Sequence, residues 1–131
     1  MSWTASQIAV CLIGVLHVGF MIGELFPWEC PWIMALVLQK WPLQLDLTVN
    51  DRHFVSMVVH NAGIYNGIVA LGLFVAAKTE AFHVQIALLT GGIVAGLFGA
   101  ATLTEVTIVQ AIFGAIALAI VIRCTRRAHP P

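Results

Sequence analysis

Two ionisable residues, His17 and Glu24, interrupt an apolar run near the N-terminus. They are seven residues apart, close to two turns of an α-helix, so their side chains share one face. A carboxyl group and an imidazole in apolar surroundings are suited to general acid–base chemistry, and the spacing favours such a pair. Two simpler interpretations stay open. Glu24, three residues before Pro27, lies in the hydrated interface, and His17 is a neutral imidazole that hydrogen-bonds between helices.

A second apolar run carries four hydrogen-bonding side chains: His60, Asn61, Tyr65 and Asn66. On a helix, Asn61 and Tyr65 share a face one turn apart, whereas the other two flank that face on opposite sides. An unpaired polar group inside a membrane costs several kcal/mol, so these groups require partners on other helices, water or a ligand. We expect Asn61 and Tyr65 to face His17 and Glu24 across a helix contact.

The resulting hypothesis is a pocket for a small lipophilic molecule between the helices of these two runs. Its catalytic groups are predicted to be Glu24, His17 and Tyr65, and its binding groups Asn61, Asn66, His60 and Gln110. Isomerisation or hydration of a carbonyl, epoxide or hydroxyl compound suits such groups, because neither reaction needs a cofactor. The alternative is that the polar groups only hydrogen-bond the helices to one another.

Metal binding has little support in the pattern. His17, His60 and Glu24 have the side-chain types of metal ligands, but none of them belongs to an HxxxH or ExxH pair, the spacing that would set two ligands one turn apart on a helix. The three cysteines have no spacing typical of a disulfide or zinc framework. The sequence therefore predicts neither a metal site nor a cofactor.

The composition is that of an integral membrane protein. The 131 residues are 60% hydrophobic and 9% charged, and the mean hydropathy is +0.97. The formal net charge is zero, which offers no basic surface for nucleic acid. The N-terminal run lacks a basic start and is interrupted by polar residues, so a retained helix is expected rather than a cleaved signal peptide. We predict one membrane domain, 1–131, in contact with lipids.

Four apolar runs are long enough to span, because a spanning helix needs about 20 residues. They cover about 5–26, 54–77, 83–103 and 106–122. The short connections between the last three predict antiparallel neighbours, so the expected fold is an all-α integral membrane four-helix bundle.

The connection 27–53 holds three tryptophans, Trp28, Trp32 and Trp41, and the apolar run Ile33–Leu38. This run is too short to span, and tryptophan is enriched at the membrane–water interface. The segment is therefore predicted to be an interfacial or re-entrant helix, or a surface that docks on another membrane protein.

Small residues recur at spacings that let helices approach closely. The glycines expected to serve helix packing are Gly19, Gly23, Gly63, Gly67, Gly92, Gly96 and Gly99. The run 83–103 is the richest in small residues, so we expect it to be central.

Basic residues predict the orientation. Lys78 lies on the same side as Arg123, Arg126 and Arg127, and Lys40 and Arg52 lie on the other. The positive-inside rule then places both termini in the cytoplasm, and the membrane is predicted to be the bacterial inner membrane.

Four motifs occur in order: His17-x-x-Phe20-Met21-x-x-Glu24-x-Phe26-x-Trp28, Asn61-x-Gly63-x-Tyr65-Asn66-Gly67, Ala95-Gly96-x-x-Gly99-Ala100-x-Thr102, and Gln110. Together they resemble the small bacterial membrane proteins grouped as domain of unknown function 1304. The resemblance covers nearly the whole chain and implies a four-span membrane protein with no assigned activity. Two features depart from the family pattern. Ala62 stands where the family has a glutamine, with His60 as a nearby polar replacement, and the connection after Trp28 is more apolar than in relatives, which suits docking on a partner.

Three functions fit these observations. The first is the lipophilic-molecule pocket, as a binding protein or an enzyme. The second is a small proton-coupled transporter, by analogy with four-span exporters that work around one carboxylate in their first helix. The third is a non-catalytic accessory subunit of a larger membrane complex.

Overall fold

The computed structural model describes residues 3–26, 30–37 and 49–128, and every regular element in that part of the chain is helical. The elements are α1 (Ala5–Leu25), α2 (Pro31–Val37), α3 (Val49–Lys78), α4 (Phe82–Thr102), the 3-10 turn η1 (Glu105–Thr107) and α5 (Ile108–Ala128). Four stretches are long and apolar enough to cross a membrane: Ala5–Leu25, His53–Lys78, Phe82–Thr102 and Glu105–Arg127. The predicted all-α membrane fold is therefore confirmed. The third helix begins at residue 49 rather than at 54.

Local signals set the start of α1. The Thr4 hydroxyl accepts a hydrogen bond from the Gln7 backbone N–H at 3.2 Å, and the Gln7 side chain accepts one from the Thr4 N–H at 2.9 Å. This reciprocal capping satisfies backbone donors that the first turn leaves without partners.

A tight turn joins α3 to α4 and makes them antiparallel. Glu80 takes a left-handed backbone conformation with φ 54°, and the Ala81 N–H donates to the Ala76 carbonyl at 3.1 Å. This hydrogen bond satisfies one of the backbone carbonyls that the last turn of α3 leaves without a partner within the helix. Between α4 and α5, the Thr104 hydroxyl caps the short turn by accepting from the Val106 N–H at 3.3 Å.

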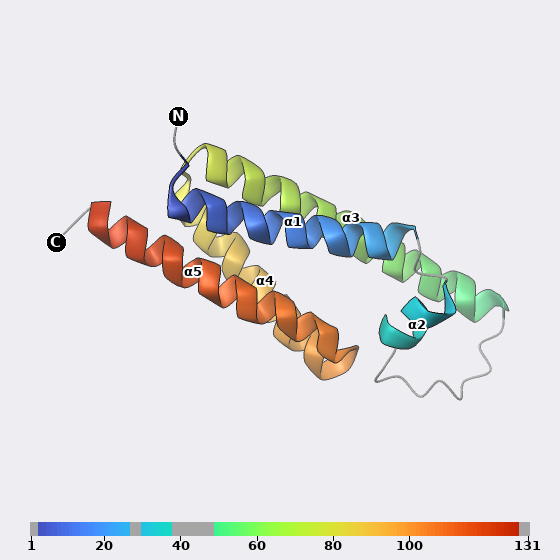
Figure 1. The fold of residues 1–131 in the computed structure, drawn as a ribbon. Helices are drawn as coiled ribbons and strands as arrows, with labels where there is room; N and C mark the ends of the chain where they lie inside the picture. Colours follow the sequence, from blue (N-terminus) through green and yellow to red (C-terminus); the bar gives the residue numbers. More distant parts are fainter. Residues whose placement is uncertain (1–2, 27–29, 38–48, 129–131) are drawn as a thin grey trace.

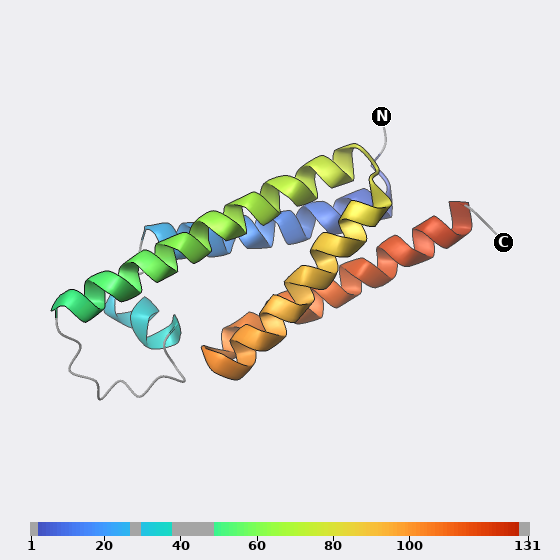
Figure 2. The same ribbon diagram turned by 180° about the vertical axis from the view of Figure 1, so that it is seen from behind.

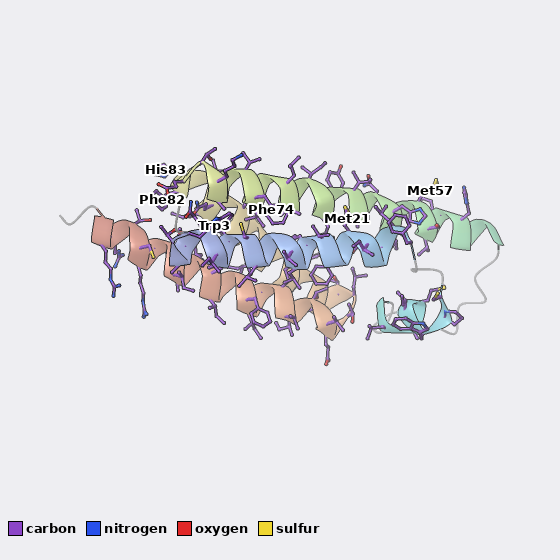
Figure 3. The ribbon with its side chains drawn as sticks, turned by 45° about the horizontal axis from the view of Figure 1, so that its top comes forward. Trp3, Met21, Met57, Phe74, Phe82 and His83 are labelled. Atoms are coloured by element: carbon purple, nitrogen blue, oxygen red, sulfur yellow. The ribbon has the colours of Figure 1, made fainter. Side chains whose placement is uncertain are left out.

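The four long helices form two antiparallel pairs. The most extensive packing joins α1 to α3, followed by α4 to α5, and the pairs meet along α1 and α5 and, less extensively, along α3 and α4. Both termini lie at the end that holds the α3–α4 turn (Figure 1). From that turn α3 and α4 diverge, so the two pairs separate toward the opposite end (Figure 2). Figure 3 labels side chains along the length of the bundle. Trp3, Phe82 and His83 lie near the end that holds the termini, Phe74 and Met21 lie farther along, and Met57 lies toward the opposite end.

The apolar core lies where the two pairs meet. Its largest fully buried apolar side chains come one from each long helix: Val10, Leu73, Leu89 and Val121. Because lipid tails are as apolar as these side chains, the core stabilises the bundle through close packing rather than through removal from water.

Glycines permit the close approach of α1 and α3. A methyl group added at Gly63 would lie 3.0 Å from Leu25 Cγ, and one at Gly67 would lie 2.7 Å from Met21 Sδ. Gly14, which was not among the predicted packing glycines, lies under the Phe74 ring. A methyl group added at Gly14 would lie 2.6 Å from the nearest carbon of that ring.

The α4–α5 contact differs from the α1–α3 contact because it brings backbone against backbone. A methyl group at Gly96 would lie 2.7 Å from the Ala111 nitrogen and 2.9 Å from the Thr107 carbonyl oxygen. One at Gly99 would lie 2.9 Å from Thr107 Oγ1.

Two predicted packing glycines have a different position. A methyl group at Gly19 or Gly23 would meet no heavy atom of the described residues within 4 Å, so no other described helix approaches α1 there. These two glycines lie on the side of α1 opposite the bundle, where a close helix contact had been expected.

The connection between α1 and α3 is described only in part. Residues 31–37 form the seven-residue helix α2, too short to span a membrane, with Trp32 69% exposed and Ile33 buried. Trp28, Leu38 and Trp41 lie outside the described residues.

Candidate functional site

One face of α1 carries three polar side chains toward the other helices, and a carboxamide from a different helix meets each of them. The pairs are Ser6 with Gln85 of α4, His17 with Gln110 of α5, and Glu24 with Asn66 of α3. Polar groups at membrane depth need partners, and these three pairs supply them. The sequence had predicted the face shared by His17 and Glu24.

The Glu24 pair lies near the end of α1 that is far from the termini. Asn66 Nδ2 donates to Glu24 Oε2 at 2.8 Å, and both side chains are half-buried. The close approach at Gly63 makes this reach short, since a methyl group there would lie 3.2 Å from Glu24 Cβ. Among the residues whose side chains the structure describes, Asn66 supplies the only hydrogen bond to this carboxyl group.

The His17 pair lies deep in the bundle. His17 is 2% exposed, and its Nδ1 lies 2.9 Å from the Ile13 carbonyl oxygen. Its Nε2 lies 3.4 Å from Gln110 Nε2, which also donates to the Gly92 carbonyl oxygen at 3.0 Å. Gln110 thereby connects three helices, and both nitrogens of the imidazole are engaged.

Gly92 lies directly beside this pair. A methyl group there would be 3.6 Å from His17 Cε1 and 3.8 Å from Gln110 Nε2, which is ordinary contact. The predicted packing glycine therefore faces a side-chain pair and not the backbone of another helix.

The Ser6 pair closes the end near the termini. Gln85 is completely buried, donates from Nε2 to the Ala76 carbonyl oxygen at 2.8 Å, and accepts from Ser6 Oγ at 3.4 Å. The sequence prediction missed both side chains. The available signal was a glutamine inside an apolar span, the same signal that marked Gln110.

Asn61 and Tyr65 do not face Glu24 and His17. Both are exposed on α3, Tyr65 to 60%, and Asn66 takes the place beside Glu24 that had been expected for them. Asn61 lies two residues before Gly63, which puts it about 200° around the helix from the glycine that contacts α1. That angle is the physical reason for the correction.

The other predicted site residues are separated. His60 is half-buried on α3 and takes no part in the hydrogen bonds of Glu24 or His17. His17 and Glu24 are about 10.5 Å apart along α1, from the 1.5 Å rise per residue. They share a face, but this separation is too long for direct proton transfer between them. Among the described residues, no three His, Cys, Asp or Glu side chains gather as metal ligands would.

These features define a small polytopic membrane protein whose spanning helices are joined by buried carboxamides, with one half-buried carboxyl group near the end of its first helix. The family described as protein of unknown function (DUF1304) matches residues 11–122, and the chain belongs to that family, as its motifs predicted. The match includes Glu24, His17 and their partners, whereas Ser6 precedes it. No curated protein and no solved structure matches the chain.

Proposed function

We propose that the protein provides a membrane-embedded acid/base site for a small lipophilic molecule, with Glu24 as the group that exchanges a proton. Asn66 is the orienting residue of this site. The observation that carries the proposal is the Asn66 Nδ2 to Glu24 Oε2 hydrogen bond of 2.8 Å in a half-buried position between two spanning helices.

A comparison of the three polar pairs on α1 supports the choice of Glu24. Gln85 and Gln110 each donate to a backbone carbonyl of a neighbouring helix as well as meeting their α1 partner, so these two pairs are held in place. Asn66 has no such second anchor among the described residues, and Glu24 has a second carboxyl oxygen to offer. Glu24 is therefore the member of the three that is free to take a ligand.

The chemistry follows from the groups present. A carboxyl group in partly apolar surroundings can give a proton to, or take one from, a carbonyl, epoxide or hydroxyl group. The Asn66 amide fixes one carboxyl oxygen and leaves Oε1 for the ligand. The substrate class is an apolar molecule with one such oxygen function, and isomerisation or hydration are the reaction types.

The test compares Glu24→Gln with Glu80→Gln in protein reconstituted into liposomes. Glu80 is a matched control, because it is exposed in the α3–α4 turn. Dicyclohexylcarbodiimide, which enters membranes and modifies protonated carboxylic acids, should label Glu24, as mapped by peptide mass spectrometry. A panel of long-chain epoxides and enolisable ketones should slow that labelling.

Turnover is the second measurement. Deuterium exchange into the ketones, or diol formation from the epoxides, should be lost in Glu24→Gln and kept in Glu80→Gln, with both variants unfolding at wild-type detergent concentrations. Turnover that survives Glu24→Gln would refute the role of this carboxyl group.

A second candidate is a non-catalytic subunit of a larger membrane complex. It is favoured by Asn61 and Tyr65, whose hydrogen-bonding groups are exposed within a spanning stretch, and by the exposed Trp32 on α2. Trp28, Trp41 and the run Ile33–Leu38 would extend that docking surface. Purification in a mild detergent separates the candidates: a stoichiometric protein neighbour supports the subunit, and a free chain with Glu24-dependent turnover supports the enzyme.

We also propose that both termini lie in the cytoplasm of a bacterial cell, with the protein in the inner membrane. Lys78 and the arginines of the last helix belong to the end that holds both termini (Figure 1). A membrane-impermeant maleimide should modify the exposed Cys30 in intact cells, and should modify Lys78→Cys only after permeabilisation. The reverse pattern would show the opposite orientation.

A further inference from the structure

The hydrogen bonds around His17 determine where its proton lies. A backbone carbonyl oxygen can only accept, so the Ile13 oxygen at 2.9 Å requires a proton on His17 Nδ1. Only the nitrogen of a carboxamide can donate, so the 3.0 Å contact with the Gly92 carbonyl oxygen fixes the orientation of the Gln110 amide.

With that orientation fixed, the Gln110 nitrogen is also the atom that faces His17. It has two hydrogens: one is given to Gly92, and the other points to His17 Nε2 at 3.4 Å. Nε2 must therefore be the acceptor. The two ring nitrogens lead to the same answer independently, which is a neutral imidazole with its proton on Nδ1.

We infer that Gln110 is a positioning residue that keeps His17 Nε2 unprotonated and joins α1 to α4 and α5. A proton on Nε2 would place one N–H donor against another, and turning the Gln110 amide to relieve this would set its oxygen against the Gly92 oxygen. The same contact covers the lone pair that a metal ion or a proton would use. His17 is thus removed from proton exchange, and its task is to hold the face of α1 that presents Glu24.

This inference goes beyond the proposed function and does not depend on it, because its test reads the protonation of His17 and not turnover. The protein is labelled with nitrogen-15 histidine and reconstituted into lipid bilayers, and its spectrum is recorded by solid-state NMR. The chain has five histidines, so His17 is assigned by the signals that disappear in His17→Gln. The nitrogen shifts and the attached protons distinguish the two neutral tautomers and the doubly protonated ring.

The wild-type protein should show a neutral His17 with the proton on Nδ1. Gln110→Glu replaces the donor by an acceptor, so His17 should then carry protons on both nitrogens. Gln110→Leu should leave the ring neutral and move the Nε2 resonance away from its hydrogen-bonded position. Gln85→Leu is the matched control, because it removes the other buried glutamine and should leave both His17 resonances unchanged.

A wild-type proton on Nε2 would overturn the assignment without any variant. An Nε2 resonance that Gln110→Leu fails to move, or that Gln85→Leu moves equally, would remove the positioning role of Gln110. If Gln110→Glu does not fold, the wild-type and leucine spectra still decide the matter.

Discussion

Replacing Gly96 by alanine tests the closest approach of a glycine to the backbone of another helix among the described residues. The added methyl group would lie 2.7 Å from the Ala111 nitrogen, whereas ordinary contact begins at 3.4 Å, so α4 and α5 must separate by about 0.7 Å. Both atoms that it meets first belong to backbone, which cannot rotate away as a side chain can. Overpacking of this kind costs about 1–3 kcal/mol, and the higher helix propensity of alanine returns about 1 kcal/mol. A net loss of up to about 2 kcal/mol is expected.

Gly91→Ala is the matched control, because a methyl group there meets no heavy atom of the described residues within 4 Å. Gly91→Ala gains the higher helix propensity of alanine without a steric clash, so this variant should be more stable than Gly96→Ala by about 1–3 kcal/mol. Unfolding by sodium dodecyl sulfate in mixed micelles, followed by circular dichroism, measures both variants on one scale. Equal stability of the two variants would refute the backbone contact between α4 and α5.

Three further predictions test other contacts by the same unfolding measurement. Gln85→Leu should cost about 1–3 kcal/mol, because the Ala76 carbonyl oxygen loses its buried donor, and a wild-type midpoint would contradict that hydrogen bond. Gly67→Ala should cost less than Gly96→Ala, because the added methyl group meets the flexible end of the Met21 side chain. A loss larger than that of Gly96→Ala would mean that Met21 cannot move. Thr4→Ala should cost about 1 kcal/mol and speed amide exchange in the first turn of α1; unchanged exchange would argue against the cap.

The length and hydropathy of the four apolar runs were sufficient to predict the spans, because lipid requires each to be a continuous helix. The partner of Glu24 was predicted incorrectly. The four polar groups on α3 were grouped by their proximity in sequence, but Asn66, rather than Asn61 or Tyr65, lies toward the side that Gly67 and Gly63 turn to α1. A helical wheel that included those glycines would have separated it from Asn61 and Tyr65.

Other features are harder to predict from a single sequence. Gln85 is a glutamine inside an apolar span, but it and Ser6 stand near the ends of their runs, where polar side chains are ordinarily hydrated, so the signal did not distinguish a buried pair from a hydrated one. The divergence of α3 from α4 depends on how two helix pairs pack, and no pattern within one helix contains that information.

The three carboxamide pairs also bear on the proposal that Glu24, near the end of α1 far from the termini, is the group that exchanges a proton. Near the termini, Gln85 joins α1, α3 and α4, and at mid-helix Gln110 joins α1, α4 and α5. Each glutamine donates one hydrogen bond to a backbone carbonyl. If either glutamine changed its partner, that buried carbonyl would be left without a donor. Glu24 lies beyond both glutamines, one residue before the end of α1, and hydrogen-bonds to Asn66 of α3. The helix pairs have separated toward that end of the bundle (Figure 2). Under the proposed function, Glu24 would exchange a proton or a ligand while the hydrogen bonds of Gln85 and Gln110 hold the helices together.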